Sequence, residues 1–327
     1  MKKIALMPAK QRAELFSLTA SKVGITPAAA EKDFWITWVL MVVFECPELK
    51  KELRFKGDTS LSKCYGLIER FSEDIDLILD WNEVSEKNPT QTRSKTQQDK
   101  INKSINEQAQ SYIAHTILPL LTKAFDNICV ATIDKNDPHN INITYPASFK
   151  DQYLRPQVLL EIGPLAAMMP SEICKVSSYC AQHFPKVFEQ SNIQVSTIKA
   201  QRTFYEKLTI LHAEAHRPEN KKMPIRYARH YYDVYQMIQK GLADQALKQS
   251  ELLEQVVVFK QKFYPMNWAN YNEATLQQIK LMPSEHHIKT LEKDYQSMQE
   301  MIFGTYPTFK KLMQCLQEFQ NTLNQIK

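Results

Sequence analysis

The sequence predicts an α/β protein in which a small mixed sheet with flanking helices is followed by a helical domain. Three observations predict this fold class. Strand-like apolar runs fall between residues 53 and 198 and are separated by turn residues. Helical periodicity precedes these runs and dominates from residue 199 onward. Glycine is scarce, with six in 327 residues, which argues against a loop-rich all-β protein.

The chain length predicts more than one structural unit. A chain of 327 residues exceeds the usual size of a single core, so we expect two units around one cleft. We expect N-terminal helices packed on the core over 1–50, the sheet domain over 51–199, and a helical C-terminal domain over 200–327 that closes the cleft. The expected strands are Leu53–Phe55, Asp74–Leu79, Ile128–Ile133, Ile141–Tyr145, Gln157–Ile162 and Ile193–Ile198.

The helix expected to end near Phe44 carries an aromatic and aliphatic stripe that includes Trp35 and Trp38. We expect these rings to pack on the core and not to stack on bases. The polar stretch from Asn82 to Asp99 predicts an exposed loop, and residues 100–125 return to helical periodicity.

A strand, a tight turn and a helix start follow one another from Leu53. The apolar run ends at Gly57, and Thr59 and Ser60 then offer helix N-cap hydroxyls. Such a turn presents backbone N–H groups at the positive end of a helix dipole, which suits a phosphate.

The next strand carries an Asp-x-Asp motif. Strand alternation places Asp74 and Asp76 on one face, while Ile75 and Leu77 face the other way. Two adjacent carboxylates repel each other unless a cation lies between them, and hard oxygen ligands of this kind suit Mg²⁺ beside a substrate phosphate. For an isolated Asp-x-Asp, the alternative is an acidic edge strand with a solvated face.

The run FKGDTSLSKCYGLIERFSEDIDL resembles the signature of the AbiEii/AbiGii-type nucleotidyltransferase toxins, members of the DNA polymerase β-like nucleotidyltransferase superfamily. The superfamily pattern is a Gly-Gly or Gly-Ser turn, a spacer, an Asp-x-Asp strand, and a third carboxylate on a later strand. The resemblance makes 51–199 the nucleotidyltransferase domain. It implies transfer of a nucleoside monophosphate from an NTP to a hydroxyl, with release of pyrophosphate. Asp58 replaces the usual second glycine, so like-charge repulsion weakens triphosphate binding unless a metal or Lys63 offsets it.

The resemblance also implies roles for individual residues. Asp74 and Asp76 hold two Mg²⁺ ions, and Glu161 supplies the third carboxylate and helps deprotonate the acceptor. The alternative for Glu161, a single acid in an apolar strand, is an ion pair with a basic residue such as Arg155. The nucleotide-binding set is Gly57, Asp58, Thr59, Ser60, Lys63 and Lys207.

Two C-terminal segments extend the resemblance. RTFYEKLTILHAEAHRP and RYARHYYDVY resemble family motifs in which a Lys and an Asp complete the active site, here Lys207 and Asp233. From periodicity we expect Arg202 and Lys207 on the surface of a helix near 199–214. The next helix should place Arg226, Arg229 and Asp233 on one face, and the alternative role of Asp233 is an ordinary ion pair with Arg229.

Positive charge gathers on one segment. Residues 201–240 hold eight Lys and Arg against four Asp and Glu, a net +4 of the chain's +5. An anionic partner would require such a segment. Together with the toxin family that the chain resembles, this favours RNA, especially a tRNA 3′ end, as the acceptor, contacted by Arg202, Arg226 and Arg229.

The remaining expectations concern partners and location. The six cysteines lack CxxC spacing, which argues against a zinc site or a disulfide framework. The longest uncharged apolar run, Ile36–Phe44, is too short to span a bilayer, so we expect a cytoplasmic protein without a membrane partner. The resemblance implies a toxin of a toxin–antitoxin or phage-defence pair, with an antitoxin protein or its regulator as a possible partner.

Three other functions stay open. Asp-x-Asp also marks nucleotide-sugar glycosyltransferases, but only about seventy residues precede it here, too few for their nucleotide-binding half. A non-catalytic or weakened relative that binds nucleotide and acts through a protein partner would fit Asp58. A nucleotidyltransferase that modifies a protein or small molecule would share the same core.

Overall fold

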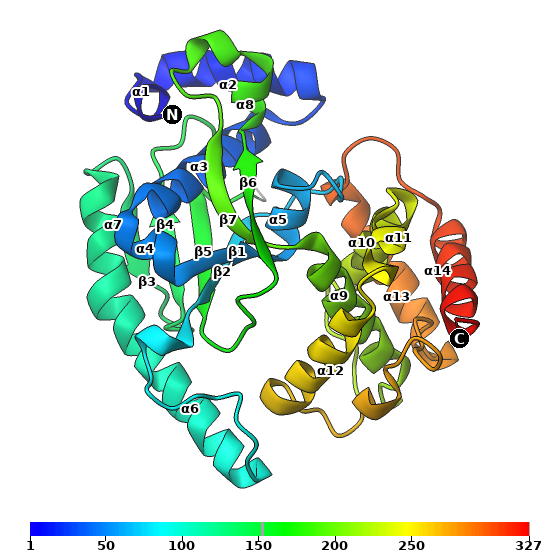
Figure 1. Cartoon of the computed structure of the whole chain (residues 1–327). Coiled ribbons are helices and arrows are strands. Elements are labelled where there is room, and N and C mark those ends of the chain that lie inside the picture. The colour runs from blue at the N-terminus through cyan, green and yellow to red at the C-terminus, as the bar shows by residue number, and fades with distance from the viewer. Residues whose placement is uncertain (152–153, 327) are drawn as a thin grey trace. The chain divides into compact units, whose positions relative to one another are not determined.

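The computed structural model describes residues 1–151 and 154–326, and the chain divides into two compact units (Figure 1). Unit 1 comprises Met1–Cys64 and Ser72–Ile198, and unit 2 comprises Tyr65–Phe71 and Lys199–Lys327. The short segment 65–71 therefore separates Gly57 from Asp74 in the chain but belongs to the helical unit.

Unit 1 is an α/β fold built from eight helices and seven strands over its described residues. The helices are α1 (Lys2–Ala5), α2 (Ala9–Val23), α3 (Pro27–Glu45), α4 (Pro47–Glu52), α5 (Gly57–Lys63), α6 (Lys95–Tyr112), α7 (Leu118–Phe125) and α8 (Tyr179–His183). The strands are β1 (Leu53–Lys56), β2 (Asp74–Leu79), β3 (Val130–Ile133), β4 (Asn140–Thr144), β5 (Gln157–Gly163), β6 (Ser171–Val176) and β7 (Ile193–Ile198). A π-helical turn, Ile113–Ile117, joins α6 to α7.

The strands form one mixed sheet in the order β3-β4-β5-β2-β1-β7-β6. The pairs β1–β7 and β2–β5 are parallel, and the other neighbours are antiparallel. This confirms the mixed sheet predicted from the sequence. Strand β2, which carries the Asp-x-Asp motif, lies near the middle of the sheet, between β1 and β5.

The core of unit 1 lies between one face of the sheet and the helices that cover it. Helix α3 packs against β2, β5 and β7 and runs across this face (Figure 1). Trp35 and Trp38 on α3 are 0% and 2% exposed, which confirms that these rings pack in the core. From β2, Ile75 and Leu77 enter the same core, so its alternate residues must lie on the opposite face.

Unit 2 is helical apart from its short segment 65–71. Its helices are α9 (Ala200–Ala215), α10 (Ala228–Gln239), α11 (Leu242–Leu247), α12 (Glu251–Phe263), α13 (Glu285–Met298) and α14 (Phe309–Asn324). Helix α9 contacts α10, α11 and α12, and its residues Phe204, Leu208 and Leu211 are fully buried. Segment 65–71 is tied to the C-terminal part of this unit, because Arg70 and Ile302 form an isolated antiparallel β-bridge.

Two elements differ from the sequence-based expectation. Strand β6 was not predicted, because it is an edge strand whose exposed Glu172 and Ile173 break the alternation of burial. Helix α6 begins at Lys95, inside the stretch expected to be loop, because Ser94 and Gln97 form a capping box there. Among the described residues, no helix combines the length and apolar character that crossing a bilayer requires.

Candidate active site

Three carboxylates lie on the face of the sheet opposite α3. Asp74 and Asp76 are half-buried and alternate with the buried Ile75 and Leu77, which confirms that the two aspartates share a face. In the strand register, Asp76 lies beside Glu161 on the parallel strand β5. The register therefore brings together the three carboxylates that the resemblance assigns to the metal.

The same cross-strand row continues on both sides of the acids. Lys56 on β1 is the register partner of Asp76, and Asn140 on β4 is the partner of Glu161. The row thus reads Lys56, Asp76, Glu161, Asn140 across four strands. A cation flanks the carboxylates at one end of this row, and an amide flanks them at the other end.

Gly57 lies against the carboxylate of Asp76. Its φ of +77° is in the left-handed region, and a Cβ added there would be 2.0 Å from Asp76 Oδ2. Only glycine fits both conditions, because any side chain would strain the backbone and displace the carboxylate. The turn predicted at Gly57 therefore positions Asp76 directly.

The environment of Asp76 disfavours its negative charge. Burial is the largest cause and raises the pKa of Asp76 to about 7, against the opposing effect of the Lys56 charge. The nearby charges of Asp58, Glu161 and Asp74 raise the pKa further. An added cation would relieve both the burial cost and this repulsion.

The donor chemistry of the row fits a divalent metal ion. Asp74, Asp76 and Glu161 offer hard carboxylate oxygens on one face of the sheet. Gly57 has no Cβ, so no side chain of this residue presses on the Asp76 carboxylate. Over the described part of the chain, no three His, Cys, Asp or Glu side chains already surround one point closely enough to form a metal-binding group. The assignment of these residues as metal ligands therefore stays a prediction.

The expected N-cap role of Thr59 and Ser60 is wrong. Helix α5 begins at Gly57, with Lys56 as its N-cap residue, so Thr59 and Ser60 lie inside the helix and are at most 1% exposed. Thr59 Oγ1 lies 2.7 Å from Ser72 Oγ and 2.5 Å from the Asp74 carbonyl oxygen. Ser60 Oγ donates to the Gly57 carbonyl at 2.7 Å. These hydroxyls join the turn to the start of β2, and Asp58 occupies the first turn of the helix.

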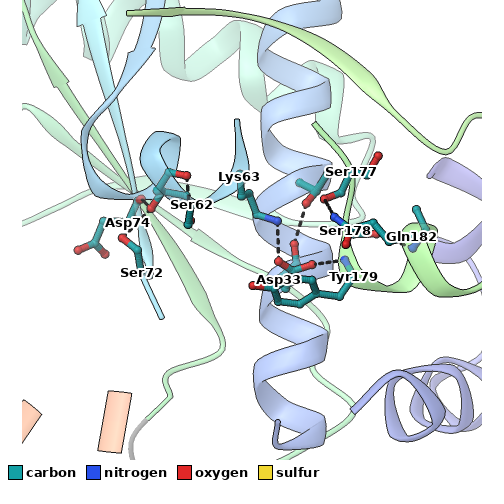
Figure 2. Close-up of polar contacts among 12 residues, drawn as sticks. Asp33, Ser62, Lys63, Ser72, Asp74, Ser177, Ser178, Tyr179 and Gln182 are labelled. Atoms are coloured by element: carbon teal, nitrogen blue, oxygen red, sulfur yellow. Dashed lines mark hydrogen bonds and ion pairs between the residues drawn. The ribbon is translucent and has the colours of Figure 1, made fainter. Parts of the chain in front are cut away.

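Lys63, at the end of α5, forms a buried ion pair. Its Nζ donates to Asp33 Oδ1 at 2.5 Å and lies 5.4 Å from the centre of the Tyr179 ring. Figure 2 shows Asp33 on α3 between Lys63 and the start of α8. The Lys63 side chain is only 8% exposed. The charge expected to offset Asp58 is thus engaged with Asp33.

Unit 2 contains a second charged cluster, centred on Asp233. Arg70 donates to both carboxylate oxygens of Asp233, each at 2.7 Å, and Lys207 Nζ lies 2.8 Å from Oδ2. The exposed fractions are 0% for Asp233, 3% for Arg70 and 4% for Lys207. The structure therefore joins the two residues that the resemblance pairs, and it adds Arg70.

Three expectations for this unit need correction. Arg202 and Lys207 were expected on the surface, but both are buried, and Arg202 pairs with Glu206 at 3.1 Å. Arg226 does not share a helix face with Arg229 and Asp233, because α10 begins at Ala228. Arg226 has φ +63°, and its N–H donates to Asp294, whose carboxylate also accepts from the Ala228 N–H.

A known protein family matches most of this chain. Residues 38–324 match the family described as Nucleotidyl transferase AbiEii toxin, Type IV TA system. The chain belongs to the AbiEii family. AbiEii proteins are nucleotidyltransferases that serve as toxins of type IV toxin–antitoxin systems, which implies an NTP substrate and an antitoxin partner.

The fold comparison agrees with the family. The structure is similar to that of MenT4, a nucleotidyltransferase toxin from Mycobacterium tuberculosis H37Rv, with a TM-score of 0.52 and 14% sequence identity. The alignment covers 95% of this chain and 90% of MenT4. At this identity, the likeness shows a shared fold. No curated protein matches the chain.

Sequence reasoning missed three residues at these AbiEii clusters: Lys56, Arg70 and Asp33. Lys56 follows from strand alternation once β1 is paired with β2, so an antiparallel register would have found it. Arg70 and Asp33 left no local signal, because their partners are 163 and 30 residues away in the chain.

Proposed function

We propose that this AbiEii-family protein transfers a nucleoside monophosphate from an NTP to a hydroxyl of RNA, with Mg²⁺ as the metal and the cytoplasm as the location. The three carboxylates of Asp74, Asp76 and Glu161, which share one sheet face beside Gly57, carry the proposal. Three carboxylates on one sheet face repel one another, and this repulsion adds to burial, the largest cause, in raising the pKa of Asp76. A bound metal–nucleotide complex would turn that cost into binding energy.

In the proposed reaction, the acceptor oxygen forms a bond to the α-phosphorus while the bond to the β-phosphate oxygen breaks and pyrophosphate leaves. Glu161 takes the proton of the acceptor hydroxyl on its carboxylate. Asp74 and Asp76, with Glu161, would hold two Mg²⁺. When bound, these ions stabilise the charge on the attacking and leaving oxygens.

In this proposal the Gly57 turn lies beside the nucleotide phosphates, and its backbone N–H groups bind them in place of the Thr59 and Ser60 hydroxyls. Thr59 and Ser60 are buried and bonded within the protein, so their part is to fix the turn against Asp74. Gly57 and Asp58 are the residues of the turn that we expect next to the phosphates. Lys63 supports the same turn from its far end through Asp33.

Lys207 and Asp233 remain proposed catalytic residues, on the basis of the family motifs that they match. Their ion pair at 2.8 Å supports a joint role, since Asp233 fixes the position of the Lys207 ammonium. Arg70 holds Asp233 by two hydrogen bonds and becomes a positioning residue in this proposal. Replacing Lys207 by Met should lower the transfer rate by roughly 10²–10³, as the loss of one preorganised contact to developing charge does.

The RNA acceptor, with a tRNA 3′ end as the first candidate, is supported by the charge of residues 201–240. Within this segment, Arg226 is exposed, Arg229 is half-buried, and Arg202 is buried against Glu206 and Phe259. Arg226 is therefore the best-placed of the three proposed acceptor contacts. Its loss should reduce the salt dependence of RNA binding by about one counterion.

A labelling experiment tests the proposal. The protein is incubated with each of the four NTPs, labelled on the α-phosphate, together with Mg²⁺ and total cellular RNA. We expect RNA to gain label from one preferred NTP, no label from the γ-phosphate, and loss of the signal in EDTA. Label in a protein or small molecule would reject RNA as the acceptor. No transfer from any NTP would favour a nucleotide-binding relative that acts through a partner.

A further inference from the structure

Helix α3 carries three consecutive charged residues in an apolar setting. Glu31, Lys32 and Asp33 are 1%, 2% and 3% exposed, and the next residues, Phe34 and Trp35, are fully buried. Removing a charge from water costs several kcal/mol unless good hydrogen bonds and an opposite charge compensate it. The contacts of these three residues therefore indicate which structural role offsets the cost of burying their charges.

Asp33 joins two other elements of unit 1. Its Oδ1 accepts from Lys63 Nζ at 2.5 Å, and its Oδ2 accepts from the backbone N–H of Tyr179 at 2.7 Å (Figure 2). Lys63 also lies over the Tyr179 ring. The end of α5 is thus held between α3 and the first residue of α8.

Lys32 contacts the residue directly before the strand that carries the Asp-x-Asp motif. Its Nζ forms an ion pair with Glu73, and Lys32 is almost fully buried while Glu73 is about one quarter exposed. Glu73 directly precedes Asp74 in the chain. Neighbouring residues of α3 therefore bind the two segments that meet at the candidate site.

Helix α5 depends on such contacts for its orientation. It has seven residues, too few to be stable as an isolated helix in water. Its first residue, Gly57, touches the Asp76 carboxylate, and its last residue, Lys63, is the one that Asp33 holds. A rotation of α5 would move Gly57 against the Asp76 carboxylate.

We propose that Asp33 and Lys32 are positioning residues, which fix α5 and the start of β2 so that the Gly57 turn and the Asp-x-Asp carboxylates keep their mutual placement. This inference rests on the proposed function, because it concerns the same site. The two residues precede the segment 38–324 that matches the AbiEii family. Their effect reaches the reaction through Lys63 and Glu73 and involves no direct contact with substrate.

Glu31 provides a matched control on the same helix. It is buried to the same degree, and its carboxylate accepts from the backbone N–H groups of Ser148 and Phe149 at 2.8 and 3.1 Å. These hydrogen bonds reach neither α5 nor the residues directly before Asp74. Glu31→Gln therefore removes a buried charge from α3 without touching the proposed positioning contacts.

The test compares kcat and KM for the NTP in the wild type and in D33N, K63M, K32M, E31Q and the double variant D33N/K63M. All are assayed at a temperature where circular dichroism shows them folded. We expect D33N and K63M each to lower kcat/KM by about 10²-fold, the effect of a misplacement near 1 Å. The double variant should fall no further than either single variant, because both remove the same contact. K32M should act in the same direction, and E31Q should stay within about two-fold of the wild type.

Hydrogen exchange gives a second readout that needs no activity. Amides of residues 57–63 should exchange faster in D33N and K63M and at the wild-type rate in E31Q. If the single variants fail to fold, the double variant, which leaves no unpaired charge at this position, carries both measurements.

Several results would overturn the positioning role. Wild-type kcat/KM in the folded D33N/K63M variant would do so, as would unchanged exchange in 57–63. A fall in K63M with wild-type activity in D33N would instead make Lys63 a direct nucleotide contact. Failure of the wild type to transfer label from any NTP would reject the proposed function, and the exchange data would then decide the structural role alone.

Discussion

The Asp-x-Asp strand of unit 1 and the Asp233 cluster of unit 2 arrange their carboxylates in opposite ways. In unit 1, Asp74, Asp76 and Glu161 share one face of the sheet, and the pKa of Asp76 is raised to about 7. In unit 2, Asp233 is fully buried yet accepts three charge-assisted hydrogen bonds, two from Arg70 and one from Lys207. One region accumulates like charge, and the other neutralises a single acid.

The difference separates carboxylates that repel one another from a carboxylate whose charge is already compensated by two cations. Like charges held together store unfavourable energy, which a divalent cation would release on binding. A buried ion cluster with good geometry has little further to gain from a ligand at its acid. Replacing Asp74 or Asp76 in unit 1 should therefore lower the transfer activity. Replacing Asp233 in unit 2 should first lower the stability of the protein.

The largest expected effect is the loss of transfer in Asp74→Ala and Asp76→Ala. Both variants should lose detectable transfer of label, because each removes a carboxylate of the proposed metal site. Their melting temperatures should equal or exceed that of the wild type in buffer without Mg²⁺, since one repulsive charge is gone. Labelling and thermal denaturation measure the two effects.

Asp80→Ala serves as the control for removing an acid from the same strand region. Asp80 follows β2 and accepts from the Asn82 N–H at 3.0 Å, so its loss should cost about 0.5–2 kcal/mol of stability while activity is retained. Mg²⁺-dependent labelling that persists in either Asp74→Ala or Asp76→Ala would contradict the metal assignment.

Asn substitutions compare the two regions at constant shape. Asp233→Asn should lower the free energy of unfolding by about 3–5 kcal/mol, because Arg70 and Lys207 would be left as buried cations without their shared acid. Asp76→Asn should leave it unchanged or raise it. Urea denaturation of both variants at pH 8 without metal measures the difference. Equal losses of unfolding free energy in Asp233→Asn and Asp76→Asn would contradict the contrast between the two clusters.

His212 is another buried polar group of unit 2 whose ring nitrogens both have hydrogen-bond partners. Its Nδ1 accepts from the Lys280 N–H at 3.1 Å, and its Nε2 lies 3.0 Å from the Asn270 carbonyl, which fixes a neutral tautomer. Burial lowers the pKa of His212 from 6.5 to about 4. The unfolded chain then binds a proton that the folded chain excludes, so stability is full above pH 6.5 and falls as the pH drops toward 4.

The expected loss over this window is at most about 3 kcal/mol. His212→Gln should remove this part of the pH dependence, although it should lower stability at pH 7. Urea denaturation between pH 4 and 7.5 gives both slopes. Identical slopes in variant and wild type would show that His212 already titrates normally in the folded protein.

The sequence was informative where chemistry follows from local spacing. The alternation in β2 predicted the shared face of Asp74 and Asp76, and the glycine after β1 predicted the turn that touches Asp76. The family resemblance predicted Glu161, but only the parallel register of β2 and β5 places it beside Asp76. Most strands of unit 1 and the helical second half of the chain were likewise predictable from periodicity.

What the sequence could not predict depends on contacts between distant residues. Arg70 lies within the quoted signature but pairs with Asp233, 163 residues away, so no local pattern marks it. Arg202 and Lys207 look like surface residues on a helical wheel, yet each is buried with an acidic partner. Long cationic side chains can be buried once paired, which hydrophobic periodicity does not report.

The smallest expected effect concerns Asp58, the residue that departs from the family pattern. Asp58 lies in the first turn of α5, and its charge adds to the repulsion that raises the pKa of Asp76. Asp58→Asn keeps the shape and removes that charge, which should tighten NTP binding about five-fold, the effect of roughly 1 kcal/mol of repulsion near the surface. Calorimetry with an NTP and Mg²⁺ measures the change.

Asp58→Gly should tighten NTP binding by a similar factor but at a cost in stability. The substitution removes an acid that favours the positive end of α5, worth about 0.3–1 kcal/mol, and glycine is a poor helix former. Comparing the Asn and Gly variants therefore separates charge from backbone effects. If both variants weaken NTP or Mg²⁺ binding, the Asp58 carboxylate is a fourth metal ligand beside Asp74, Asp76 and Glu161. The departure from the family pattern would then strengthen metal binding in unit 1, because it adds an acid to the proposed site.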